Sequence, residues 1–151
     1  MASKPKYMAV QAAALLVGSV LVVVGLLGFI PGITTDYDRL EWAGRQSEAK
    51  LFGVFVVSGL HNLVHLALGV LGFAMARSYG AARAYFLGGG LVYLALWVHG
   101  LLIDHGGTAN IIPVNGAGNW LHFGLGVSMV LLGLTLAGQR DPTKRRTRIR
   151  A

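Results

Sequence analysis

The sequence predicts an all-α integral membrane protein that folds as a four-helix bundle. Of its 151 residues, 54% are hydrophobic and only 13% are charged, and the mean hydropathy is +0.60. A chain of this composition is too apolar for an ordinary soluble domain. It contains four apolar runs of about 20 residues or more, the length that crosses a bilayer at ~1.5 Å per residue. We expect the spans near residues 8–30, 51–76, 84–103 and 117–137.

The first run, residues 8–30, is interrupted only by Gln11, glycines and a serine. It is longer than the apolar core of a signal peptide, which has about 7–15 residues, so we expect an uncleaved first helix. Pro31 and Gly32 end that helix, because proline removes a backbone donor and glycine favours turns. The chain has 22 glycines, and small residues let membrane helices approach closely.

Two long polar segments, residues 34–50 and 104–118, separate the spans, whereas residues 77–83 form a short basic turn. Polar backbone and charged side chains belong in water, so these segments are expected to be loops. Short connections between antiparallel helices favour a bundle with both long loops on one face.

Ten of the thirteen basic residues lie in the amino-terminal segment, the 77–83 turn and the tail at 139–151. The two long loops hold five of the six acidic residues. The positive-inside rule therefore predicts a multi-pass protein of the bacterial cytoplasmic membrane with both termini in the cytoplasm. The basic tail is expected to attract anionic lipids by ~1 kcal/mol per basic residue. These roles account for the net charge of +7, so no nucleic acid is expected as a partner.

A short pattern occurs twice. Asn62, His65, Gly69 and Val70 in the second span have the same spacing as Asn119, His122, Gly126 and Val127 in the fourth. Both copies run in the same direction across the membrane, so the chain could be two two-helix halves related by a pseudo-two-fold axis along the membrane normal. In each copy, the glycine four residues after the histidine opens a notch beside the imidazole.

Three motifs carry a family resemblance: Leu60-His61-Asn62-Leu-Val-His65, Asn110-x-x-Pro113-Val-Asn115 and Asn119-Trp120-Leu-His122. In these residues the chain resembles the domain-of-unknown-function 4383 family of small bacterial four-span membrane proteins. The resemblance covers most of the chain. It implies the same four-span architecture and points to no particular reaction.

All five histidines lie in or beside the predicted spans. Lipid offers an imidazole no hydrogen-bond partner, so His61, His65 and His122 are expected to point into the bundle. In one interpretation, neutral imidazoles and amides form interhelical hydrogen bonds. The polar seam would then include Asn62, Asn115, Asn119 and Trp120, with Tyr93 and Trp97 as further members. This interpretation predicts an accessory or scaffolding component, either a homo-oligomer or a part of a larger membrane complex.

In the alternative interpretation, the histidines bind a cofactor in a redox protein, since neutral imidazole is the commonest metal ligand. Haem b would use His61, His65 and His122, whereas zinc or copper would use His61, His99, His105 and His122. From the predicted helix ends, His65 lies deeper than His122. The two come level only if the fourth span begins earlier, within residues 111–113.

The sequence gives little support to an enzyme. The chain has no cysteine and no Gly-x-Ser-x-Gly pattern, and Asp104 is the only carboxylate near the histidines. No catalytic residue is therefore assigned, and an accessory role is favoured over the redox alternative.

Overall fold

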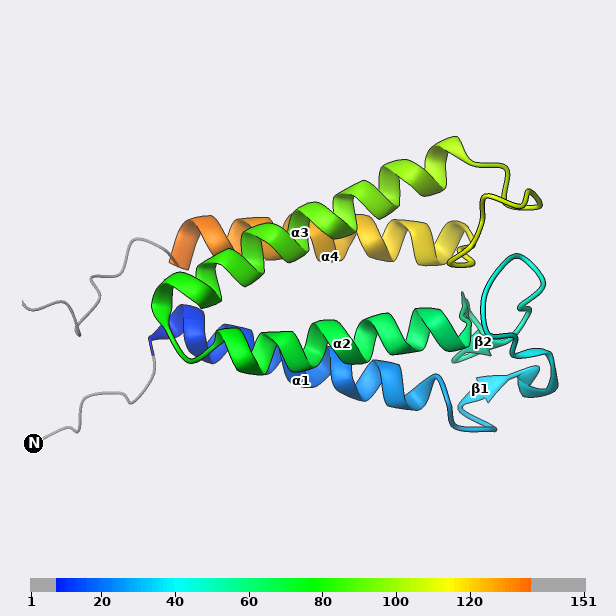
Figure 1. Cartoon of the computed structure of the whole chain (residues 1–151), viewed down its shortest axis with the longest axis horizontal. Helices are drawn as coiled ribbons and strands as arrows, with labels where there is room; N and C mark the ends of the chain where they lie inside the picture. The colour runs from blue at the N-terminus through cyan, green and yellow to red at the C-terminus, as the bar shows by residue number, and fades with distance from the viewer. Residues whose placement is uncertain (1–7, 137–151) are drawn as a thin grey trace, which may run out of the picture.

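The structure, a computed structural model, describes residues 8–136. In this part of the chain four α-helices lie side by side (Figure 1). They are α1 (Ala9–Leu27), α2 (Gly59–Met75), α3 (Tyr79–Leu102) and α4 (Gly116–Thr135). The all-α bundle predicted from the sequence is thus confirmed. Among the described residues, α1, α3 and α4 are long and apolar enough to cross a membrane, and α2, with 17 residues, is shorter.

The second predicted span begins eight residues too early. It was expected at Leu51, but α2 starts at Gly59, because residues 50–56 form a hairpin of two short strands. Ser58 precedes the helix in an extended conformation and caps it, since its hydroxyl accepts a hydrogen bond from the His61 N–H at 3.1 Å. The cap ends the hairpin and fixes the first turn of α2.

The third predicted span begins too late. It was expected at residue 84, whereas α3 starts at Tyr79, after the Ser78 hydroxyl accepts from the Ala81 N–H at 3.2 Å. The basic turn predicted at residues 77–83 is accordingly much shorter, and Arg83 lies within the helix. The first and fourth spans were predicted to within about three residues at the ends that the structure describes. The fourth span's last residue, 137, and the 139–151 tail lie outside the described residues.

A small antiparallel sheet covers the carboxyl-terminal end of α1, within the segment expected to be a polar loop. It consists of β1 (Thr34–Thr35), β2 (Lys50–Leu51) and β3 (Phe55–Val56), in the order β1-β2-β3. A short 3-10 helix, Tyr37–Arg39, lies between β1 and β2. The buried side chains below the sheet, Ala49, Leu51 and Val57, pack against Val24 and Leu27. This satellite core attaches the sheet to the helices.

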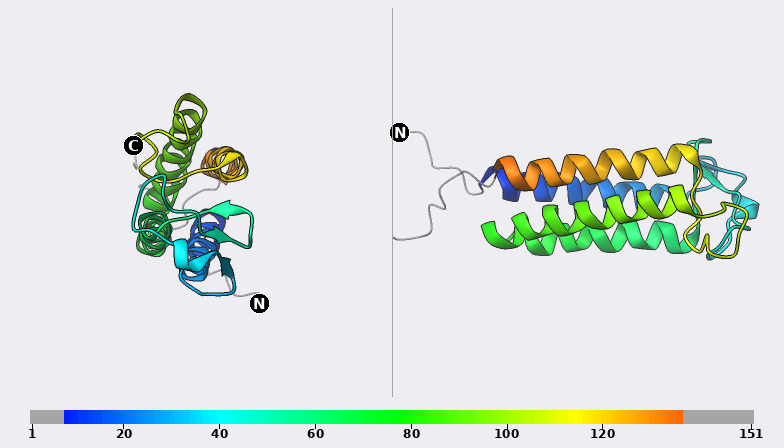
Figure 2. Two further views of the ribbon diagram at one scale, coloured as in Figure 1. Left: turned by 90° about the vertical axis from the view of Figure 1, so that its right-hand side faces the viewer. Right: turned by 90° about the horizontal axis from the view of Figure 1, so that it is seen from above.

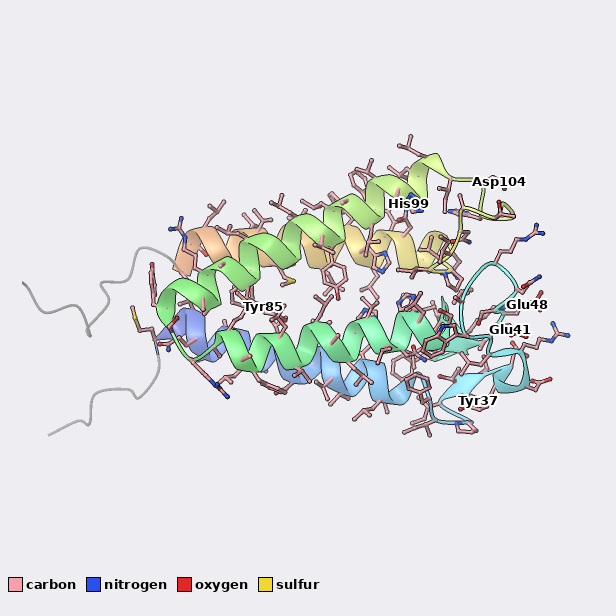
Figure 3. All side chains as sticks on the ribbon, viewed as in Figure 1. Tyr37, Glu41, Glu48, Tyr85, His99 and Asp104 are labelled. Atoms are coloured by element: carbon pink, nitrogen blue, oxygen red, sulfur yellow. The ribbon has the colours of Figure 1, made fainter. Side chains whose placement is uncertain are left out.

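The sheet and the loop between α3 and α4 lie at one end of the bundle. The start of α1, the α2–α3 turn and the end of α4 lie at the opposite end (Figures 1 and 2). Glu41, Glu48 and Asp104 all occur at the sheet end (Figure 3). The prediction that both long loops share one face of the bundle is therefore confirmed.

The helices pack as two pairs, α1 with α2 and α3 with α4. In the first pair, a Cβ atom placed on Gly69 would lie 2.7 Å from the Gly18 carbonyl oxygen. In the second pair, a Cβ atom on Gly126 would lie 3.0 Å from the Gly90 carbonyl oxygen. Both crossings thus need glycine, because only its missing side chain lets the backbones come this close.

The two helix pairs also resemble each other in the contacts of the asparagines of the repeated pattern. The Asn62 side chain lies against Gly28, the residue that follows α1, and Asn119 lies against Gly100 of α3, so that an added Cβ would overlap either amide. The contacted glycines are ten residues apart in each case, Gly18 to Gly28 and Gly90 to Gly100. The repeat seen in the sequence is therefore matched by the same contacts in both helix pairs.

The two pairs meet through an apolar core toward the end that carries the α2–α3 turn. Its buried members are Val10, Ala14, Leu21, Ala76, Ala82, Tyr85, Phe86, Tyr93 and Met129. Gln11, the one amide in the first span, donates from Nε2 to the Ala76 carbonyl at 2.9 Å and so joins α1 to the end of α2. Toward the sheet end, the contact between the pairs becomes polar.

Candidate functional site

Three imidazoles and a phenol ring occupy the polar half of the contact between the helix pairs. The His61 and His122 ring centroids lie 5.8 Å apart, across the contact between α2 and α4. His61 stacks on His65 at 4.7 Å. Tyr93 of α3 lies 6.2 Å from His65 and 5.7 Å from His122. We call His61, His65, Tyr93 and His122 the histidine seam.

The seam is buried, but its hydrogen bonds are incomplete. His61 and His65 are 6% exposed and His122 is 4% exposed, so the prediction that all three point into the bundle is confirmed. Within the described residues, Nδ1 of His61, Nδ1 of His122 and the Tyr93 hydroxyl have no hydrogen-bond partner. The backbone carbonyl of Pro113 lies close to the His61 imidazole. These unmatched atoms leave the seam able to bind something further.

The depth mismatch inferred from the sequence is wrong. His65 is six residues after the first residue of α2, Gly59, and His122 is six residues after the first residue of α4, Gly116. The two histidines lie equally far from their helix starts mainly because α2 begins late, at Gly59; α4 begins at Gly116, and not within residues 111–113. The hairpin at residues 50–56 thus brings the two copies of the pattern into register.

The four residues assigned to a polar seam do not form one. Asn62 and Asn119 face the other helix of their own pair, and not each other. Side chains three residues apart on a helix point in directions that differ by about 60°. Each asparagine therefore contacts a different neighbour from the histidine that follows it three residues later. Asn115 caps α4 by accepting from the Gly118 N–H at 3.0 Å, and it donates to the Val54 carbonyl at 2.8 Å.

Trp120, the fourth residue of that set, faces outward. It is 59% exposed and lies near Trp97 and Phe123, with ring centroids at 6.0 and 5.7 Å. Tryptophan on the outside of a bundle near one end is typical of the membrane–water interface. The rotation of α4 therefore turns Trp120 away from the interior of the bundle.

The four histidines expected to bind a metal do not all lie close together. Within residues 8–136, no group of three or more His, Cys, Asp or Glu side chains is placed so that it could hold a metal ion. His99 is exposed near the carboxyl-terminal end of α3 (Figure 3). His105 lies in the following loop, with Nε2 2.9 Å from the Gly100 oxygen. Of the predicted set, only His61 and His122 have rings in contact.

Two cavities flank the histidine seam. The smaller, of about 140 Å³, lies on the α1 side and is lined by His61, Asn62 and His65 together with aliphatic residues and Phe55. The larger, of about 290 Å³, lies on the α3 side and includes His99 and His122 in its wall. We call them the α1-side cavity and the α3-side cavity. Through them the seam is accessible from both sides of the contact.

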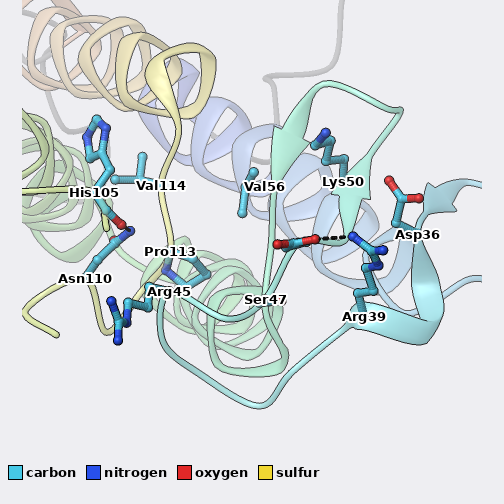
Figure 4. Close-up of a pocket in the computed structure, with 11 residues that line it drawn as sticks. Asp36, Arg39, Arg45, Ser47, Lys50, Val56, His105, Asn110, Pro113 and Val114 are labelled. Carbon is cyan, nitrogen blue, oxygen red and sulfur yellow. Dashed lines mark hydrogen bonds and ion pairs between the residues drawn. The ribbon is translucent and has the colours of Figure 1, made fainter. Parts of the chain in front are cut away.

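A third, polar cavity of about 270 Å³ lies among the loops at the sheet end of the bundle (Figure 4). The polar side chains in its wall mainly form hydrogen bonds and ion pairs with other residues of the same loop segments. Arg39 forms an ion pair with Glu48, and the Arg45 guanidinium donates to the Gly106 carbonyl. Asn110 donates from Nδ2 to the His105 carbonyl at 3.0 Å. These contacts join the sheet segment to the loop between α3 and α4.

The comparison with protein families agrees with this architecture. A model described as a domain of unknown function (DUF4383) matches residues 11–135, which span all four helices. The chain belongs to the DUF4383 family. No curated protein and no solved structure matches the chain significantly.

Sequence reasoning missed the partners of the two asparagines. Gly28 lies at the end of α1, and Gly100 lies near the end of α3, far in sequence from Asn62 and Asn119 respectively. The signal that could have revealed them is the shared ten-residue spacing from Gly18 and Gly90. That spacing becomes informative only once the helix pairs are known.

Proposed function

We propose that this protein is an accessory component of the bacterial cytoplasmic membrane that binds a ligand at the histidine seam and carries out no reaction itself. The observation that supports the proposal is the set of unpartnered polar atoms in the seam, on His61, Tyr93 and His122. A buried polar atom without a partner costs about 1–3 kcal/mol. Apolar side chains would pack more stably there, so a ligand that completes these hydrogen bonds explains why polar ones are present.

The membrane placement is part of the proposal. Helix α2 would be about 26 Å long at ~1.5 Å per residue, slightly less than the ~30 Å hydrocarbon core. We infer that it crosses beside α1 as one of four spans, with the sheet end outside and both termini in the cytoplasm. The charge distribution supports this orientation, and the outward-facing Trp120 near the sheet end supports a membrane boundary at that end. Anionic lipid at the tail and a larger membrane complex are the proposed partners.

A metal or haem b is the second candidate ligand, and the His61–His122 contact favours it. The two rings are 5.8 Å apart, and the Nδ1 atom of each has no hydrogen-bond partner among residues 8–136. Two imidazoles provide half of a tetrahedral zinc or copper site, so the remaining ligands would have to come from a partner or from water. A haem would have to displace Tyr93, which lies 5.7 Å from His122. For these reasons the redox role stands second.

Mass spectrometry, absorption and metal analysis of the full chain, purified in mild detergent, test both candidates. Under the accessory proposal, the wild type retains an organic molecule close to one per chain, and His122→Leu loses it. His105→Leu is the matched control, because this histidine lies outside the seam and should leave the molecule bound. A Soret band or a stoichiometric metal that disappears in His122→Leu would replace the accessory proposal by the redox one. An empty wild-type protein would overturn both.

A further inference from the structure

The α3-side cavity has the size and composition of a small-molecule site. Its volume of about 290 Å³ is close to the lower end of the 300–1,000 Å³ typical of such sites. Helices α2, α3 and α4 and the loop before α4 all contribute to its wall. Six of the eight lining residues are aliphatic: Leu60, Leu96, Ala109, Ile111, Ile112 and Val114. The cavity therefore favours an apolar molecule.

The two other lining residues are His99 and His122. His122 is buried, and its Nδ1 has no partner within the described residues, whereas His99 is exposed near the outer end of α3. One imidazole thus lies at the buried side of the cavity, in the histidine seam, and the other lies near its open side. Neutral imidazole can donate or accept a hydrogen bond, depending on its tautomer. An oxygen atom on the ligand is a suitable partner for either ring.

We propose that the α3-side cavity binds a lipid-soluble molecule that presents a carbonyl or hydroxyl oxygen to His122 and His99. This inference rests on the proposed function and names its ligand class. No Lys, Arg, Asp or Glu lines the cavity, so a charged ligand would lose its hydration without gaining an ion pair. An apolar body with one or two neutral oxygens incurs no such cost, and it can enter from the membrane beside the exposed His99.

Two membrane molecules share this chemistry. One is the ring of a quinone or quinol, and the other is the ester region of a phospholipid. The α1-side cavity is less suitable for either, because at about 140 Å³ it is close to the 150 Å³ known to hold a single benzene ring. Binding should therefore depend on the α3-side cavity. Substitutions that fill the α1-side cavity then serve as controls for substitutions that fill the α3-side cavity.

Cavity-filling substitutions test the location. Ala109→Trp fills the α3-side cavity from an exposed loop position, so the helices need not rearrange, and Leu60→Trp fills it from α2. Leu121→Trp fills the α1-side cavity and is the control. In phosphatidylcholine nanodiscs, a decyl-substituted benzoquinone and its quinol serve as the first probes, with binding measured by equilibrium dialysis. Native mass spectrometry of the delipidated protein, with phosphatidylethanolamine added back, is the second arm.

The result expected for a quinone is saturable binding of one molecule per chain, weakened more than tenfold in Ala109→Trp and Leu60→Trp and unchanged in Leu121→Trp. His99→Leu should weaken it about tenfold, the effect of one lost hydrogen bond. The same pattern in the phosphatidylethanolamine arm alone would identify the lipid as the source. Binding that survives both filling variants, or no binding in either arm, would overturn the proposal. A co-purified molecule lost in His122→Leu but kept in Ala109→Trp would overturn only this inference and leave the proposed function intact.

Discussion

A methyl group added at Gly69 should separate α1 from α2. Its Cβ would lie 2.6 Å from Val22 Cγ2, 2.7 Å from the Gly18 carbonyl oxygen and 2.8 Å from the Val22 backbone nitrogen. Carbon–oxygen contacts between neighbouring backbones are normally about 3.3–3.6 Å, so the helices must move apart by at least about 0.6 Å. Two of the three obstructing atoms belong to the backbone and cannot rotate away.

Overpacking of this kind costs about 1–3 kcal/mol. Alanine recovers up to about 1 kcal/mol through its higher helix propensity, so the right reference is another glycine-to-alanine change. Gly124→Ala on α4 is that control, because nothing lies within 4 Å of its added Cβ. We expect Gly69→Ala to be about 1–3 kcal/mol less stable than Gly124→Ala, and Gly126→Ala to resemble Gly69→Ala.

Unfolding in mixed micelles with a rising fraction of dodecyl sulfate, followed by circular dichroism, measures these differences. The repeat predicts losses of similar size at Gly69 and Gly126, since each contacts a glycine carbonyl of its partner helix. Equal stability of Gly69→Ala and Gly124→Ala would refute the close backbone contact between α1 and α2.

Three further predictions follow from topology, from the asparagine contacts and from the outer loops. A membrane-impermeant maleimide added to whole cells should label Thr108→Cys in the outer loop but not Tyr79→Cys, and the reverse pattern would contradict the orientation. Gly28→Ala should destabilise the protein by about 1–3 kcal/mol, because its methyl overlaps the Asn62 amide, and adding Asn62→Ala should recover part of that loss in a double-mutant cycle. Arg39→Ala should change the unfolding free energy by less than about 1 kcal/mol, because its ion pair joins side chains that are 61% and 58% exposed.

Hydropathy was enough to predict the bundle, but it misplaced the start of α2. Residues 51–57 are mostly apolar, and average hydropathy cannot distinguish an apolar hairpin from the beginning of a helix. The turn of that hairpin contains Phe52 and Gly53, both with positive φ, at 54° and 70°. Glycine next to aromatic and β-branched residues favours a hairpin, so this local signal was present in the sequence. The long apolar run that follows obscured it.

The inward direction of the histidines was predictable, whereas the partners of the other polar residues were not. Imidazoles have no partner in lipid, and that argument alone places His61, His65 and His122 inside the bundle. The direction of Trp120 depends on how α4 is rotated about its axis, and that rotation is fixed by the contacts at Gly90 and Gly126 between distant segments. Spacing along one helix cannot reveal such contacts.

Replacement of His122 by leucine should separate stability from ligand binding. Leucine is similar in size and removes an Nδ1 atom that has no partner, so the ligand-free protein should gain about 1 kcal/mol or more. His65→Leu should give a smaller gain, because the His65 imidazole lies close to the backbone carbonyl of His61 and leucine removes that contact. Both variants are compared with the wild type in the same micelle titration, after lipid and ligand are removed. A clear loss of stability in His122→Leu would mean that the seam already makes the hydrogen bonds it needs, and the argument for a ligand would fail.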